Sequence, residues 1–216
     1  HVYGPKGIKE AITLQLKLGN SWTNFPLLFH ELESTEAQCI FEDDKLTVTT
    51  IPLDHRVYTN GFLFQEKPGE RKLDYEAAVA AKVDHSYFNK LKQGFDVKNR
   101  EGVIIDYKDV TTTPDPTKSY AYCSDTAYLP SIVSIIKGAT VLYHEATFLK
   151  MHEHLCEKTK HSTASQAAEI AKLAEVEQLV LGHFSGRYGD YELFRSEAQV
   201  HFQNVLLAED GKVFEF

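Results

Sequence analysis

Residues 140–147 are TVLYHEAT, an apolar run of strand-forming residues that ends in a histidine, a glutamate and a threonine. A second such run, QLVLGH at 178–183, follows a helix-forming stretch at 161–176, HSTASQAAEIAKLAEV. Strand-forming runs that alternate with amphipathic helices predict an α/β fold in which helices pack outside a sheet. In that class ligands bind just beyond the carboxyl ends of the strands, where these polar side chains are expected.

The same pattern, an apolar run followed at once by polar residues, occurs earlier in the chain. TIPL at 50–53 precedes Asp54 and His55, and YAYC at 120–123 precedes Ser124 and Asp125. Histidine and aspartate hold catalytic zinc at about 2.0–2.2 Å while leaving one position open for water. Residues of this kind at the ends of several strands therefore predict a metal-dependent hydrolase.

Each of these signals is weak when it is taken alone. A single histidine at a strand end is more often a surface or hydrogen-bonding residue than a ligand, and Asp125 also suits a turn or a helix cap. The HEAT stretch at 144–147 is consistent with a buried polar pair. The joint order of these clusters, with a further one at 161–163 where a helix begins, favours a site.

The composition is that of a globular chain with a core of its own. The chain has 216 residues, of which 43% are hydrophobic and 25% charged, enough for one domain or a domain with a small appendage. Lys and Arg number 23 and Asp and Glu 31, so the net charge is 23 − 31 = −8. This charge excludes binding of nucleic acid through bulk positive potential but leaves room for a local basic patch.

The sequence also indicates the cellular location of the chain. No uncharged stretch is long enough to predict a membrane span, and the first residues lack the basic and apolar regions of a secretion signal. The three cysteines are odd in number and never spaced as CxxC, which argues against a disulfide framework and a thiolate zinc site. We therefore expect a cytoplasmic protein without membrane attachment.

Local patterns predict the remaining elements. Pro5 suits the first turn of an amphipathic helix over about 5–17 that Gly19 ends. Strands are expected at 45–53 (KLTVTTIPL), 61–64 (GFLF), 102–106 (GVIID), 205–208 (VLLA) and 213–216 (VFEF), and helices at 75–83 (YEAAVAAKV), 86–94 (SYFNKLKQG) and 131–138 (SIVSIIKG).

Several segments, in their order and spacing, resemble motifs of the ribonuclease Z family, the tRNA 3′-processing endonucleases of the metallo-β-lactamase superfamily. They are VYGPKGIKEAI (2–12), PLDHRVYTNGFLFQEK (52–67), YCSDT (122–126), VLYHEATF (141–148), HSTASQAAEIAKLA (161–174) and LGHFSGRYGD (181–190). The resemblance covers nearly the whole chain, and the combination of HEAT, HST and HFSGRY is specific. It implies a metallo-β-lactamase-type αβ/βα sandwich.

The resemblance also implies roles for individual residues. His55 would bind one zinc ion, Asp125 would bridge two, and His183 would bind the second. His161, paired with Glu145, would donate a proton to the departing 3′ oxygen. Two metals about 3.5–4 Å apart stabilise charge on a phosphate and acidify a bridging water, and a carboxylate beside a histidine keeps it protonated near neutral pH.

Three residues of the HFSGRY segment are implied phosphate ligands. Ser185, Arg187 and Tyr188 all carry hydrogen-bond donors, and an arginine can donate two parallel bonds to one phosphate.

One motif of the family is not in this sequence. The string HxHxDH, which in the family precedes the GPKG segment and supplies four ligands, occurs nowhere in the 216 residues. Three ligands do not build a dinuclear centre, because zinc seldom binds tightly to fewer than four. We expect residues 1–216 to be the carboxyl-terminal part of one such domain, incomplete because the N-terminal part is absent, with fewer than the two zinc ions of an intact site and no activity alone.

An inserted segment at about 65–98 corresponds to the arm that grips tRNA in the family. Its basic residues, Lys90 and Lys92 among them, predict phosphate contacts. The acidic residues between them fit a solvated helical face equally well.

The resulting hypothesis is a zinc-dependent endoribonuclease, a phosphodiesterase that matures the 3′ end of precursor tRNA as a homodimer. Two alternatives stay open. One is a phosphodiesterase of the same fold for small substrates such as cyclic nucleotides, and the other is a non-catalytic remnant that binds RNA or a partner.

Overall fold

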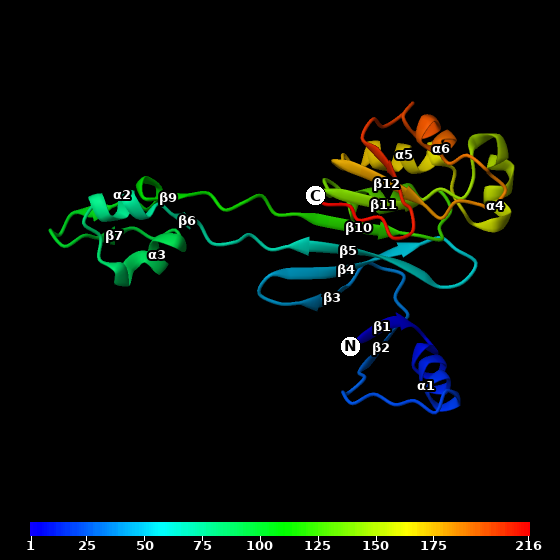
Figure 1. Ribbon diagram of the computed structural model, residues 1–216, viewed down its shortest axis with the longest axis horizontal. Helices are drawn as coiled ribbons and strands as arrows, with labels where there is room; N and C mark the ends of the chain where they lie inside the picture. Colours follow the sequence, from blue (N-terminus) through cyan, green and yellow to red (C-terminus); the bar gives the residue numbers. More distant parts are fainter. The chain divides into compact units, whose positions relative to one another are not determined.

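The computed structural model describes residues 1–216, and the chain forms two compact units (Figure 1). The larger unit comprises His1–Glu42, Thr47–Gln65 and Ser119–Phe216. The second unit, called the arm below, comprises Asp43–Leu46 and Glu66–Lys118. Each unit has a hydrophobic core of its own.

A seven-stranded sheet in the order β13-β12-β11-β10-β5-β4-β3 forms the centre of the larger unit. Its parallel strands are β10 (Ser119–Cys123), β11 (Val141–Glu145), β12 (Gln178–Gly182) and β13 (Val205–Leu207). Strand β5 (Thr59–Glu66) pairs antiparallel with β10, β4 (Leu46–Leu53) lies next to β5, and β3 (Cys39–Glu42) is the edge strand. The α/β prediction is confirmed.

Helices α5 (Ala164–Leu173) and α6 (Glu192–Ala198) lie on the same side of β11, β12 and β13 (Figure 1). Helix α5 begins at a capping box in which Thr163 accepts a hydrogen bond from the Gln166 amide and the Gln166 side chain accepts one from Thr163. This arrangement satisfies two of the amide groups that a helix leaves free at its start. The apolar side of α5 is buried in the core with Leu142 and Leu179, so the predicted helix is confirmed.

The opposite face of the sheet carries aromatic side chains. Tyr120 and Tyr122 alternate along β10 with the buried residues Ala121 and Cys123. Tyr122 stacks on Tyr143 with 4.8 Å between ring centroids and is 38% exposed. This face therefore presents a partly exposed aromatic surface.

The first residues differ from the prediction. Pro5 ends strand β1 (Val2–Pro5), which pairs with β2 (Phe29–Leu32), and helix α1 (Ile8–Leu18) begins only after Gly7. Gly7 adopts a φ of +90°, which favours glycine, and its amide donates to the Glu31 carboxylate. Because residues 2–5 pair with β2, Pro5 belongs to a strand and not to the helix. The helix ends before Gly19, as predicted.

Two other expectations need adjustment. Residues 213–216 form no strand, and the segment at 131–138 forms only a 3-10 helix, η3 (Pro130–Ser134). The remaining elements of the larger unit are η4 (Lys150–Leu155) and α4 (Cys156–Thr159), which precede α5. No helix of the chain is both long and apolar enough to span a bilayer.

The arm extends further along the chain than the expected 65–98. Its elements are β6 (Lys72–Leu73), α2 (Tyr75–Ala80), η1 (His85–Tyr87), α3 (Phe88–Lys92), β7 (Val97–Lys98), β8 (Ile104–Ile105), η2 (Tyr107–Asp109) and β9 (Thr111–Thr112). The pairing of β6 with β9 and of β7 with β8 closes the unit around Leu91 and Val110, so the arm ends at Lys118.

Candidate metal centre

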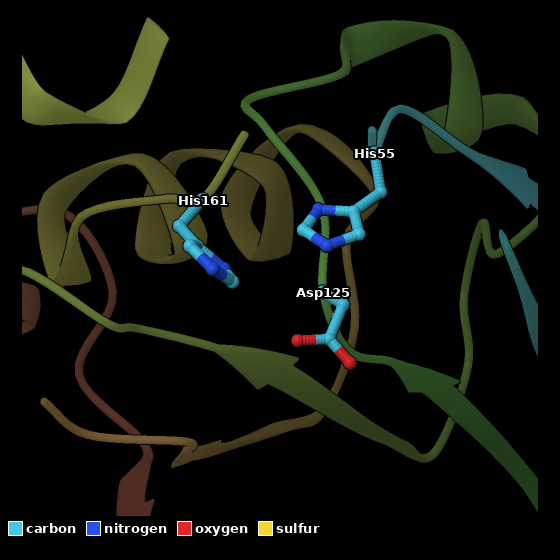
Figure 2. Close-up of side chains that lie close together, drawn as sticks. All are labelled: His55, Asp125 and His161. Atoms are coloured by element: carbon cyan, nitrogen blue, oxygen red, sulfur yellow. The ribbon is translucent and has the colours of Figure 1, made fainter. Parts of the chain in front are cut away.

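Loops at the carboxyl ends of the strands bring the predicted site residues together. His55 follows β4, Asp125 follows β10, His183 follows β12, and His161 precedes α5. Figure 2 shows His55, Asp125 and His161 around a common space, and their ligand atoms lie within 4.8 Å of one another. The same limit holds for Glu145, His161 and His183, so His161 is common to both clusters, although the sequence predicted it as a proton donor and not as a ligand.

The backbone at this site adopts a conformation that L-residues rarely take. Asp125 has a φ of +57°, and Lys160 and His183 both have a φ of +60°. A left-handed residue that is not glycine costs about 1–2 kcal/mol and persists where the surroundings hold it in place. Such strain gathers at functional sites, and here it falls on two candidate ligands and on the neighbour of His161.

The carboxylate of Glu145 is the centre of the hydrogen-bond network and is fully buried. Its Oε1 accepts from His161 Nδ1 at 2.6 Å and from the Thr126 amide at 2.9 Å. Its Oε2 accepts from the Thr147 hydroxyl at 2.7 Å, the Thr147 amide at 3.1 Å and the Ser162 amide at 3.2 Å. All the lone pairs of this buried charge are therefore satisfied.

These contacts set the protonation of the pair. Burial raises the pKa of Glu145, but hydrogen bonds from His161 and Thr147 outweigh it and leave this pKa below its ordinary value. The hydrogen bond to Glu145 raises the pKa of His161, against the smaller effect of burial. An ionised Glu145 thus favours a protonated His161, which is the state that a general acid needs.

His55 is oriented by the residue that precedes His161. The His55 Nδ1 lies 3.0 Å from the Lys160 carbonyl oxygen. A carbonyl oxygen only accepts, so Nδ1 carries the proton and Nε2 presents a lone pair. The Lys160 ammonium also pairs with Asp54 at 2.9 Å, so Lys160 joins the loop after β4 to the loop before α5.

His183 closes the site on the other side. Its Nε2 lies 3.2 Å from Asp125 Oδ1, and its Nδ1 lies 2.8 Å from the Thr147 hydroxyl oxygen. Zinc prefers histidine nitrogens and carboxylate oxygens as donors, and a zinc-binding histidine usually has its other ring nitrogen hydrogen-bonded to a neighbouring group. The residues present therefore fit a zinc site.

Of the three predicted phosphate ligands, Arg187 and Ser185 contact each other, whereas Tyr188 has other partners. Arg187 Nε donates to Ser185 Oγ at 3.2 Å, and the Arg187 guanidinium lies over the Phe148 ring at 5.0 Å. The Tyr188 hydroxyl instead accepts from the Leu149 amide at 3.1 Å.

Tyr188 is in addition bound by other groups. His152 Nδ1 lies 2.7 Å from its hydroxyl, and its ring packs edge-on against Phe194 at 5.0 Å. The Tyr188 hydroxyl thus has two partners near its own loop, and its role as a phosphate ligand stays a prediction.

The two arm lysines also differ. Lys92 pairs with Glu70 at 2.8 Å, whereas Lys90 lies over the Tyr87 ring at 5.7 Å. Other arm cations are paired as well, among them Lys72 with Asp115, Lys82 with Glu101 and Arg100 with Asp84. Of the two predicted contacts, Lys90 keeps its charge free of an acidic partner.

Three residues that orient the site carry no clear functional signal in the sequence: Thr147, Asp54 and Lys160. Thr147 stands in the HEAT segment and Asp54 beside His55, so both lie within motifs that marked the site. Lys160 carried no signal, because a lysine gives no indication of a left-handed backbone.

No protein-family model matches the chain. Ribonuclease Z of Bacteroides fragilis is 40% identical over 211 residues, which cover 98% of this chain and 69% of that enzyme. The chain belongs to the ribonuclease Z family. Ribonuclease Z of Cytophaga hutchinsonii is also 40% identical, over 215 residues that cover 99% of the chain and 68% of the relative.

Solved structures agree on the fold of this ribonuclease Z family member. Human tRNase Z, short form, matches with a TM-score of 0.63 at 22% identity, over 99% of this chain and 66% of that one. The metallo-β-lactamase fold protein YhfI from Bacillus subtilis matches with a TM-score of 0.59 at 17% identity, over 98% and 63%. The predicted metallo-β-lactamase-like α/β fold is confirmed, and the chain spans about two thirds of the length of these proteins.

The pairing of Glu145 with His161 predicts a specific change in titration. In Glu145→Gln, His161 loses its charged hydrogen-bond acceptor, so the pKa of His161 should be lower than in the unchanged chain. An NMR titration of the histidines in the metal-free chain measures this pKa. Because the pKa of His161 is raised in the folded chain, protonation of His161 stabilises the fold below pH 6.5, and this stabilisation is lost as the pH rises through the raised pKa. Glu145→Gln should lack this pH-dependent stabilisation.

Glu153→Gln is the matched control, because Glu153 contacts Gln166 and not His161. An unchanged His161 pKa in Glu145→Gln would show that the carboxylate does not hold the proton.

Proposed function

We propose that this chain supplies the carboxyl-terminal catalytic residues of a metal-dependent endoribonuclease that matures the 3′ end of precursor tRNA. One observation carries the proposal: His55, Asp125 and His183 meet at one sheet edge beside the buried Glu145–His161 pair. Membership of the ribonuclease Z family supports the reaction class, and the name of the human tRNase Z supports the substrate.

The chain's own residues divide the chemistry between them. His55, Asp125 and His183 would hold zinc, which when bound stabilises charge on the phosphate and acidifies a water molecule. His161 holds a proton for the departing 3′ oxygen, and Glu145 keeps that proton in place. Arg187, with its charge at the rim and Ser185 beside it, binds the phosphate.

The proposal includes ligands from outside these 216 residues. Three ligands fall short of two metal ions, and the string HxHxDH is not present in this sequence. The aromatic face with Tyr120, Tyr122 and Tyr143 is the surface on which the other half of an αβ/βα sandwich would pack, because its rings stay partly exposed here.

A homodimer and a cytoplasmic location belong to the same proposal. The region of α1 exposes large apolar side chains, with Leu18 77% and Trp22 82% exposed, and exposed apolar groups of this kind mark interaction surfaces. The three cysteines are free, which suits a reducing compartment.

The decisive experiment joins this chain to the part of Bacteroides fragilis ribonuclease Z that precedes the matched region. The joined protein should hold close to two zinc ions and cut a 3′-extended precursor tRNA, whereas the chain alone should hold fewer zinc ions and leave the tRNA uncut. Hydrolysis of bis(p-nitrophenyl) phosphate without tRNA cleavage would favour a small-substrate phosphodiesterase. Binding of tRNA without zinc would favour a non-catalytic remnant.

Variants of the joined protein separate the two predicted histidine roles. His183→Ala should lower zinc content and activity together, because it removes a ligand. His161→Ala should keep the zinc and lower turnover by about 10²–10⁴-fold, the usual contribution of a general acid. Metal analysis beside single-turnover cleavage measures both, and loss of zinc in His161→Ala would contradict the assignment.

The arm predicts a difference between two lysines of one helix. Lys90→Gln should weaken binding of precursor tRNA and reduce its salt dependence, because an unpaired cation releases a counterion from the RNA. Lys92→Gln should have a smaller effect, since Glu70 already neutralises Lys92. Fluorescence anisotropy over a range of salt concentrations tests this, and equal effects of the two variants would contradict it.

A further inference from the structure

The Phe148 ring contacts two residues that have different proposed tasks. The guanidinium carbon of Arg187 lies 5.0 Å from the centre of this ring, which is the geometry of a cation–π contact. The His161 ring meets the Phe148 ring edge-on, with 6.4 Å between the centroids and 73° between the planes. Phe148 is only 4% exposed, so its surroundings hold the ring in place.

The backbone of Phe148 is fixed as well. The Phe148 amide donates to the Ser162 carbonyl at 3.2 Å, and the Phe148 carbonyl accepts from the Ala164 amide at 3.0 Å. Phe148 also forms a parallel β-bridge with Thr163. These bonds join the residue after the HEAT segment to the start of α5, so the ring has a defined position at this edge of the sheet.

Arg187 has few other groups to hold it. It is exposed, it lies in a loop between Gly186 and Gly189, and no acidic side chain pairs with it. Its Nε donates to Ser185 Oγ at 3.2 Å, which leaves Nη1 and Nη2 free to donate elsewhere. An arginine side chain loses rotational freedom when it binds a ligand, and a contact that holds the side chain beforehand reduces this loss.

We infer that Phe148 is a positioning residue whose ring holds the Arg187 guanidinium in place for the substrate phosphate, and this inference rests on the proposed role of Arg187 in phosphate binding. Because Nε is bound to Ser185, Nη1 and Nη2 are the pair that donates two parallel bonds to a phosphodiester. The same ring touches His161, so one side chain sets the spacing between the phosphate-binding group and the proton donor.

NMR spectra of the chain test the contact without metal or substrate. In the unchanged chain, the Arg187 side-chain protons should show nuclear Overhauser effects to the Phe148 ring and chemical shifts displaced by it, because an aromatic face shields protons above it. Phe148→Leu keeps an apolar side chain without a ring and should abolish the displaced shifts. Phe148→Tyr keeps the ring, is the matched control and should retain them. Thermal unfolding shows whether each variant is folded.

A double-mutant cycle in the joined protein measures what the contact contributes to substrate binding. With 3′-extended precursor tRNA as substrate, Phe148→Leu should raise KM about 2–5-fold, the effect of losing a cation–π contact at an exposed site, and should leave kcat nearly unchanged. Phe148→Tyr should restore KM. Arg187→Met keeps an unbranched side chain without the charge, and in that background Phe148→Leu should no longer change KM.

The outcomes separate this inference from the proposed function. Absence of nuclear Overhauser effects between Arg187 and Phe148 in the unchanged chain overturns the inference, even if Phe148→Leu does not fold. Equal increases in KM with Arg187 present and with Arg187→Met overturn it as well, and so does a fall in kcat at unchanged KM. The expected Arg187 signals, with a joined protein that cleaves no phosphodiester, would support the contact and contradict the proposed function.

Discussion

A single buried charge, the carboxylate of Glu145, organises this end of the molecule. Leaving such a charge without partners would cost several kcal/mol, so the segments that carry its donors have to meet around it. These segments are the loop after β10, the loop after β11 and the residues just before α5, and they supply five hydrogen bonds. Folding of this region and assembly of the site are therefore the same event.

The three histidines of the site share one arrangement and differ in what holds them. Each has its Nδ1 against a separate group: a carbonyl for His55, a carboxylate for His161 and a hydroxyl for His183. The carbonyl and the hydroxyl are neutral groups that orient the two rings. The carboxylate is charged and favours an additional proton on His161, so residues of one type suit different tasks.

What the sequence predicted depended on local signals. The strand of HEAT, the strand of LVLGH and the capped helix of HSTASQAAEIAKLA are each specified by neighbouring residues, and the motifs at their ends marked the site. The limits of the arm depend on the pairing of Lys72 with Thr112. These residues are 40 positions apart, so local sequence patterns do not predict their pairing. The direction of the Tyr188 hydroxyl and the left-handed backbone of Lys160 likewise follow from tertiary packing.

A crystal structure of this chain soaked with zinc, with anomalous data at the zinc edge, tests the arrangement most directly. The network around Glu145 predicts zinc about 2.0–2.2 Å from the Nε2 of His55 or His183 and from a carboxylate oxygen of Asp125. It also predicts that Glu145 keeps its hydrogen bond to His161. Zinc bound to Glu145 or to a histidine Nδ1, or an anomalous peak only away from these residues, would contradict it.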